Sequence, residues 1–248
     1  MKILGVIPAR YASSRFPGKP LADIYGKPMI WWVYQQVIQV PEFTQVVVAT
    51  DDERIEKVCQ EWEIPVIMTS ENHPTHIHRI WEVSEKITSD YYVVVCGDEP
   101  LIDVEVIRKV LPETKEIEEL YVGGLCRYFT EPTEVLDPSN IKIVTNDKDE
   151  CILLSRSPVP FPYKTVMYQY KKVVGVECYN KKALDFFVNT KKGFLESVED
   201  VTLQRFLENK IHVKYKLVDS VSLSVDTPRD LEKVIAIIKD RKQKDEKN

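Results

Sequence analysis

An apolar stretch, Ile3 to Ile7, runs directly into a basic loop that ends at Pro20. The loop carries Arg10, Arg15 and Lys19, and its small residues favour accessible backbone N–H groups. In α/β proteins, ligands bind where loops follow the carboxyl ends of parallel strands. Because guanidinium and ammonium groups suit phosphate oxygens, this pattern predicts a first buried strand followed by a polyphosphate-binding loop.

Strand-like and helical segments alternate after this loop. Apolar runs predict strands over residues 44–50, 65–68 and 91–95, and apolar residues at helical spacing predict helices over 28–40, 52–62 and 79–86. This β-α-β-α-β order predicts an α/β fold, namely a Rossmann-like three-layer sandwich with a mostly parallel sheet and helices on both faces.

The pattern changes near residue 121. Short strands are predicted over 121–128, 141–145, 151–155, 173–179, 213–218 and 220–225, and helices over 181–188, 198–207 and 227–239. Pro228 suits the first position of the last helix, and residues 240–248 are expected to fray. We expect one domain over residues 1–248, in which 121–225 includes a smaller mixed β-lobe for substrate binding and dimer formation.

Composition narrows the function class. The chain is 44% hydrophobic, which is enough for a large core, and its net charge of −5 argues against a nucleic-acid partner. No segment resembles a signal peptide or a membrane span, so we expect no membrane partner. The five cysteines are scattered and form no Cys-x-x-Cys pair, which favours buried free thiols in a cytoplasmic protein.

Two acidic residues follow predicted strands at the same edge of the sheet. Asp98 follows the strand over 91–95, and Asp226 precedes the last helix. Mg²⁺ in nucleotide sites prefers one or two carboxylates together with phosphate oxygens and water. These two residues are therefore candidate ligands for Mg²⁺ bound with a nucleoside triphosphate.

Several segments, in order, resemble the sugar-activating cytidylyltransferases, most closely the 3-deoxy-manno-octulosonate (Kdo) cytidylyltransferases. They are residues 7–20, 21–31, 48–55, 97–102, 155–160 and 225–232, so the resemblance spans nearly the whole chain. A set of motifs in the right order is more specific than any one of them. The resemblance implies the fold of the nucleotide-diphospho-sugar transferases, a homodimer, and a product that feeds lipopolysaccharide or capsule synthesis.

The resemblance also implies a reaction and a site. The anomeric hydroxyl of a sugar acid attacks the α-phosphorus of CTP, giving a CMP-sugar and pyrophosphate, with Mg²⁺ held by Asp98 and Asp226. By resemblance Lys19, Asp98 and Asp226 are catalytic. The nucleotide-binding residues are Pro8, Ala9, Arg10, Ser13, Arg15, Lys19, Ser70 and Arg79, and the substrate-binding residues are Arg156, Glu177, Tyr179, Thr202 and Arg205.

The chain departs from the family pattern mainly where the acceptor binds. Residues 75–79 replace the usual Ser-Gly-Thr-Asp/Glu-Arg turn with Thr-His-Ile-His-Arg, and Cys96 replaces a Gln. Within 173–179 the His and first Tyr of the family pocket are lost, Glu177 stands in the second of these positions, and Thr-Leu-Gln-Arg over 202–205 replaces Glu-Gln-Leu-Arg. We infer a cytidylyltransferase with a changed acceptor: Kdo or a modified form of it, another 2-keto-3-deoxy acid, or a phosphonate.

Some assignments stay open. Glu177 is expected at the surface, or against an acceptor that carries an amine. His76 and His78 would point the same way on an extended segment and, with His73, suggest a metal, but a zinc site usually needs a fourth ligand. A glycosyltransferase would use an Asp-x-Asp motif, which Asp98-Glu99-Pro100 is not. A non-catalytic nucleotide-binding homologue is the remaining alternative.

Overall fold

One large mixed sheet forms the centre of the protein. The computed structural model describes residues 1–245 except 14, 114–118, 166 and 220–222. The strand order is β11-β7-β10-β6-β1-β4-β5, and β8 and β9 extend from β10. The strands are β1 (Ile3–Ala9), β4 (Gln45–Thr50), β5 (Val66–Met68), β6 (Tyr91–Val95), β7 (Val122–Tyr128), β8 (Lys142–Thr145), β9 (Cys151–Ser155), β10 (Lys171–Asn180) and β11 (Lys214–Leu217).

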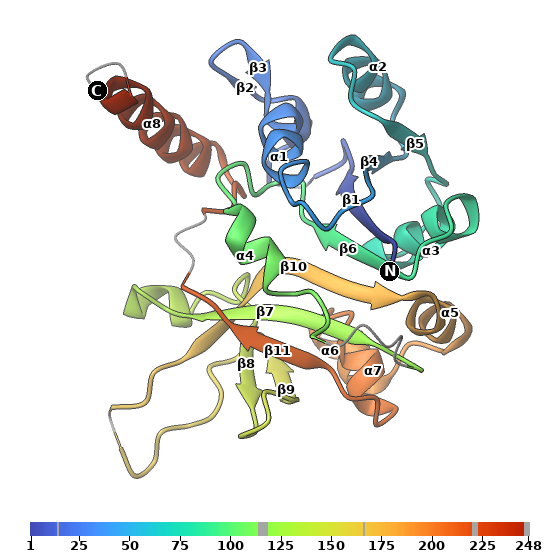
Figure 1. Ribbon diagram of the computed structural model, residues 1–248. Helices are drawn as coiled ribbons and strands as arrows, with labels where there is room; N and C mark the ends of the chain where they lie inside the picture. Colours follow the sequence, from blue (N-terminus) through green and yellow to red (C-terminus); the bar gives the residue numbers. More distant parts are fainter. Residues whose placement is uncertain (14, 114–118, 166, 220–222, 246–248) are drawn as a thin grey trace.

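Strand direction divides the sheet into two halves. β6, β1, β4 and β5 are all parallel, as the β-α-β order of the sequence predicts. β10 then runs antiparallel to both β6 and β7, and β11 pairs in parallel with β7. The strand-rich second half therefore continues the same sheet, and it projects β8 and β9 as a lobe below it (Figure 1).

Alternating side chains along the parallel strands build the two outer layers. Ile3 and Ile7 of β1 pack on one face, against a layer that contains α1, α2 and α4, whereas Leu4 and Val6 pack on the other, against α3, α5 and α7. These helices are α1 (Met29–Val37), α2 (Glu53–Glu61), α3 (His76–Lys86), α4 (Val104–Arg108), α5 (Lys181–Asn189) and α7 (Gln204–Glu208). The expected three-layer sandwich is confirmed.

The last helix, α8 (Pro228–Asp245), closes a third, smaller core. Pro228 is its first residue, as expected, and Thr227 donates backbone and hydroxyl hydrogen bonds to Asp230 at 3.0 and 2.8 Å. Val234 and Ile238 pack against Met29 and against Ile24 of the small hairpin formed by β2 (Asp23–Ile24) and β3 (Lys27–Pro28). The prediction that the helix stops near residue 239 is wrong, since it continues to Asp245.

Two other sequence predictions need correction. Helix α3 begins at His76, so the pair that we expected to lie extended is helical, and His76 and His78 point in different directions. Residues 223–225 form no strand, and residues 220–222 lie outside the described residues. The remaining short helical elements are η1 (Lys19–Leu21), η2 (Pro132–Val135) and α6 (Phe194–Glu199).

The helix predicted over 198–207 is two short helices, α6 and α7. Asp200 ends α6 in the left-handed region, with φ of 52°, and the chain turns back on itself there. Arg205 then forms a bidentate ion pair with Glu196, with N–O distances of 2.7 Å, and both side chains are nearly fully buried. The same guanidinium stacks on Phe187 and donates to the backbone carbonyls of residues 187 and 190.

Among the described residues, no helix is long and apolar enough to pass through a lipid bilayer.

Replacing Arg205 with Met is expected to lower the free energy of unfolding by about 3–5 kcal/mol, because Glu196 is left as a buried, uncompensated charge. Urea denaturation measures the loss. The double variant Arg205→Met with Glu196→Leu removes both charges and should recover most of it. A single variant as stable as the parent protein would contradict this structural role.

His78 predicts a pH dependence of stability. Burial lowers its pKa to about 4, with further lowering by Arg205 and His73, whereas unfolded histidine titrates near 6.5. Between these values the unfolded chain binds more protons, so the free energy of unfolding should fall as pH drops from about 6.5 toward 4. Urea midpoints at pH 6.5 and 5 measure the change, and His78→Asn, which does not titrate, should flatten it.

Candidate active site

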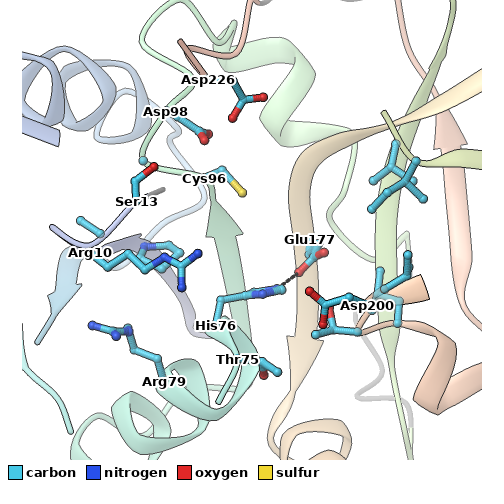
Figure 2. Close-up of a pocket in the computed structure, with 18 of the residues that line it drawn as sticks. Arg10, Ser13, Thr75, His76, Arg79, Cys96, Asp98, Glu177, Asp200 and Asp226 are labelled. Carbon is cyan, nitrogen blue, oxygen red and sulfur yellow. Dashed lines mark hydrogen bonds and ion pairs between the residues drawn. The ribbon is translucent and has the colours of Figure 1, made fainter. Parts of the chain in front are cut away.

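A cavity of about 520 Å³ lies at the carboxyl ends of the parallel strands. The basic loop after β1, the turn after β6 and the start of α3 line one part of it, and residues of β10, β9, β11 and the α6–α7 turn line the other. Figure 2 shows the two parts facing each other across the cavity, with His76 and Glu177 joined between them. The cavity therefore has a nucleotide-loop end and a lobe end.

Two carboxylates and two cations meet at the nucleotide-loop end. The Nζ atom of Lys19 lies 2.7 Å from Oδ2 of Asp98 and 3.6 Å from Oδ1 of Asp226. Arg15 donates to the same Asp226 oxygen at 2.8 Å. Residues from three distant parts of the chain thus form one charged cluster.

Backbone contacts hold the two carboxylates at this edge. A Cβ atom on Gly97 would lie 2.9 Å from the carbonyl oxygen of Pro8, so the turn before Asp98 approaches the β1 loop closely because residue 97 has no side chain. The N–H of Val225 donates to the carbonyl of Asp98 at 2.9 Å, which brings Asp226 beside it. Of the strand predicted over 220–225, before Asp226, residues 223–225 form no strand, and this hydrogen bond links them to the turn after β6.

Arg79 has an unpaired donor in the cavity wall. Its Nη2 donates to Asp51, at the end of β4, at 2.5 Å. Its Nη1 is buried and has no hydrogen-bond partner among the described residues. A buried cationic donor without a partner is costly, so its presence in a cavity points to a ligand that supplies an acceptor. Arg10 and Ser13 line the same end (Figure 2).

At the lobe end, Glu177 accepts two hydrogen bonds. His76 Nε2 lies 2.8 Å from its Oε2, and the Tyr179 hydroxyl donates to that oxygen at 2.6 Å. Burial alone would lower the pKa of His76, but the Glu177 carboxylate outweighs it and raises that pKa. Burial likewise opposes ionisation of Glu177, yet its two partners lower its pKa overall. Each partner therefore favours the charged form of the other.

This pairing corrects the expectation for Glu177. Its side chain is 13% exposed and is not a surface carboxylate. Since His76 already supplies a positive charge to it, an amine on the acceptor is not needed to balance Glu177.

Cys96 borders both ends of the cavity and is half-buried, whereas the other cysteines are fully buried as expected. Burial, and then the negative charge of Asp98, raises the pKa of its thiol well above the ordinary value. The thiol stays protonated at neutral pH, so Cys96 is not a thiolate nucleophile.

The structure gathers most of the sequence-predicted site residues around this one cavity. Those that line it are Pro8, Ala9, Arg10, Ser13, Arg15, Lys19, Arg79, Asp98, Glu177, Thr202 and Asp226. Ser70 does not line it; it is exposed, and its backbone N–H donates to Glu82 at 2.8 Å.

Three residues expected to bind the substrate do not line the cavity. Arg156 donates to the backbone carbonyls of residues 138, 199 and 200 and so braces the lobe. Tyr179 is fully buried behind Glu177, and Arg205 is held in the ion pair with Glu196. Their polar groups are satisfied within the protein, so the structure gives them positioning or packing roles.

Sequence reasoning missed several residues of the cavity wall, among them Asp200 and Tyr215, and considered His73 only as a possible metal ligand. Asp200 stands at an unpredicted helix break. Tyr215 lies in a strand whose other residues gave no functional signal. The His76–Glu177 contact joins residues 101 positions apart, and no local pattern could have shown it.

The donor set fits Mg²⁺ bound together with phosphate. Among the described residues, no group of three or more His, Cys, Asp or Glu side chains could hold a metal ion alone. Asp98 and Asp226 supply carboxylate oxygens, and Mg²⁺ usually takes one or two of these and completes its shell with phosphate and water.

Comparisons with known proteins agree with this geometry. Residues 4–217 match the family model described as "Cytidylyltransferase". The chain is 37% identical to a 3-deoxy-manno-octulosonate cytidylyltransferase of Escherichia coli, over 96% of each chain. It is 38% identical to one from Fusobacterium nucleatum, covering 97% of this chain and 98% of that one.

Solved structures extend the comparison. A CMP:2-keto-3-deoxy-manno-octonic acid synthetase complexed with CTP is similar over 97% of this chain and 100% of that chain, with a TM-score of 0.90 and 36% identity. An inositol-1-phosphate CTP transferase from T. maritima shares the fold, with a TM-score of 0.69 at 15% identity.

The chain therefore belongs to the cytidylyltransferase family and is a nucleotidyltransferase similar along nearly its whole length to the 3-deoxy-manno-octulosonate cytidylyltransferases.

Proposed function

We propose that this protein transfers CMP from CTP to the anomeric hydroxyl of a 2-keto-3-deoxy sugar acid, Kdo or a variant of it, and releases pyrophosphate. The observation that carries the proposal is the cluster in which Lys19 contacts both Asp98 and Asp226, beside Arg15. Two carboxylates and two cations in one cavity suit a reaction between two anions, which must be held together and have their charge neutralised.

The basic loop would bind the triphosphate. Lys19 and Arg15 balance the two carboxylates in the protein, and both can donate to phosphate oxygens in the same space. As pyrophosphate departs, these two residues would stabilise the charge that develops on it. Arg10 and the unpaired Nη1 of Arg79 would bind the rest of the nucleotide.

Asp98 and Asp226 would hold Mg²⁺ on the CTP phosphates. When bound, the metal supplies positive charge to the phosphoryl group and lowers the pKa of the attacking hydroxyl. The two aspartates would position the attacking hydroxyl and the α-phosphate next to each other. No protein nucleophile is needed, which agrees with the protonated thiol of Cys96.

The lobe end would receive the sugar acid. Its polar groups differ from the family pattern in sequence, and Thr202 and the His76–Glu177 pair line it.

A non-catalytic nucleotide-binding protein is less well supported. Binding a nucleotide alone would not require two aspartates, from segments 128 positions apart, to converge on one lysine. A small phosphonate acceptor is the other alternative, and the assay below separates it from a sugar acid.

We expect rapid pyrophosphate release with Mg²⁺, CTP and Kdo, measured by a coupled phosphate assay after pyrophosphatase treatment. The acceptor panel adds the amino analogue of Kdo, other 2-keto-3-deoxy acids and small phosphonates. Because His76 already pairs with Glu177, sugar acids without an amine should release pyrophosphate faster than the amino analogue does. If the protein bound CTP but released pyrophosphate with none of the acceptors, the proposal would be contradicted.

Matched variants test the metal assignment in the same assay. Asp98→Asn and Asp226→Asn should each lower kcat by at least about a hundredfold, because each removes a charged ligand near the reacting phosphate. Asp51→Asn removes the carboxylate that pairs with Arg79 and should instead raise the KM for CTP. Full activity in either of the first two variants would exclude the assigned roles.

We also propose that the protein is a cytoplasmic homodimer. Phe161, Tyr163 and Met167, between β9 and β10, have 80%, 86% and 83% of their surface exposed, which is unusual for three apolar residues close in sequence. Burial against a second copy would account for them. The five cysteines are free, which suits a reducing compartment.

The dimer is tested by light scattering during gel filtration. The protein should elute with twice the mass of one chain, and Phe161→Ser with Tyr163→Ser should shift it toward one chain. Ile152→Ser, at another exposed apolar position, serves as the control. A single-chain mass for the parent protein at micromolar concentration would contradict the homodimer.

A further inference from the structure

Three neighbouring strands place a row of residues at the lobe end of the cavity. Glu177 of β10 pairs with Gly124 of β7, and Gly124 pairs with Tyr215 of β11. Residues directly opposite one another on paired strands project from the same face of a sheet. Glu177 and Tyr215 therefore lie on the face toward α3, with no side chain between them.

Gly124 makes room for the tyrosine ring. A Cβ atom at position 124 would lie 2.6 Å from Cε1 and 2.8 Å from Cζ of Tyr215, so any side chain there would displace the ring. The ring thus lies across the middle strand, toward Glu177 and the cavity that both residues line. The position of the Tyr215 ring therefore depends on the glycine at position 124.

The Tyr215 hydroxyl is buried and has no hydrogen-bond partner among the described residues. Other buried tyrosines differ from it. The Tyr92 hydroxyl donates to the carbonyl of Ile87 at 3.0 Å, and that of Tyr179 donates to Glu177 at 2.6 Å. An unsatisfied buried hydroxyl destabilises a protein, and one at a cavity wall is expected to have a partner in the ligand.

Glu177 does not serve as that partner, although it lies in the same row. Its Oε2 atom accepts hydrogen bonds from His76 (Figure 2) and from Tyr179, and no hydrogen bond joins its carboxylate to the Tyr215 hydroxyl. The Tyr215 hydroxyl is therefore left to hydrogen-bond with a ligand group that enters the cavity.

We propose that Tyr215 is a specificity-determining residue whose hydroxyl binds a hydroxyl or carboxylate oxygen of the acceptor, from the position that Gly124 allows its ring to take. This inference rests on the proposed function and refines the substrate class: the acceptor is polyhydroxylated and long enough to span from the Asp98 and Asp226 carboxylates to β11. A small phosphonate is too short to span that distance. A site that hydrogen-bonds a substrate hydroxyl discriminates strongly against analogues that lack it.

The test is Tyr215→Phe, which removes only the hydroxyl. We expect the KM for Kdo, or for the best acidic sugar of the panel, to rise about tenfold while the KM for CTP stays the same. The ligand-free variant should melt at the same temperature or higher, because it loses an unsatisfied polar group. Acceptor-induced stabilisation in the presence of CMP should be smaller than in the parent protein.

Tyr92→Phe is the matched control, since it removes a satisfied tyrosine hydroxyl from a residue that does not line the cavity. It should lower the melting temperature and leave the acceptor KM unchanged. Turnover with an unchanged acceptor KM in Tyr215→Phe, or a marked loss of melting temperature in that variant, would overturn this inference alone. Silence of the parent protein with every acceptor, despite CTP binding, would overturn the proposed function together with it.

Discussion

The contact of Lys19 with two aspartates determines how this molecule is organised. Asp98 and Asp226 would repel each other if the ammonium did not lie between them, at 2.7 and 3.6 Å from their oxygens. To bring the three together, the chain needs the parallel strands that end at one edge, the close approach at Gly97, and the hydrogen bond from Val225 to Asp98. The sheet order, the third small core under α8 and the position of the basic loop together bring Lys19, Asp98 and Asp226 into contact.

Local patterns predict the nucleotide-loop end well. Alternating residues such as Ile3, Leu4, Val6 and Ile7 specify a strand that is buried on both faces, and its parallel neighbours follow from the β-α-β order. Arg10 and its basic neighbours follow within one loop, so a sequence motif and a spatial cluster coincide there. This explains why the residues predicted from the loop are found around one cavity.

The lobe end was harder to predict because its contacts are long-range. Arg205 has the chemistry of a substrate-binding residue, but the break at Asp200 folds it onto Glu196, and this pairing becomes visible only once both short helices are placed. His76 pairs with a residue 101 positions away, and the value of Tyr215 depends on the absence of a side chain on the strand beside it. Such residues acquire their roles from register and packing, which periodicity does not reveal.

The 211-residue separation of Arg15 and Asp226 has a consequence for the biosynthesis of the protein. The basic loop emerges from the ribosome with its cations in place, but the carboxylate that completes the cluster follows 211 residues later. A nascent or truncated chain that stops before residue 226 carries the anion-binding loop without the second acid. Such a fragment would keep the cations for a phosphate ligand, whereas the arrangement proposed for chemistry would exist only once residue 226 is present.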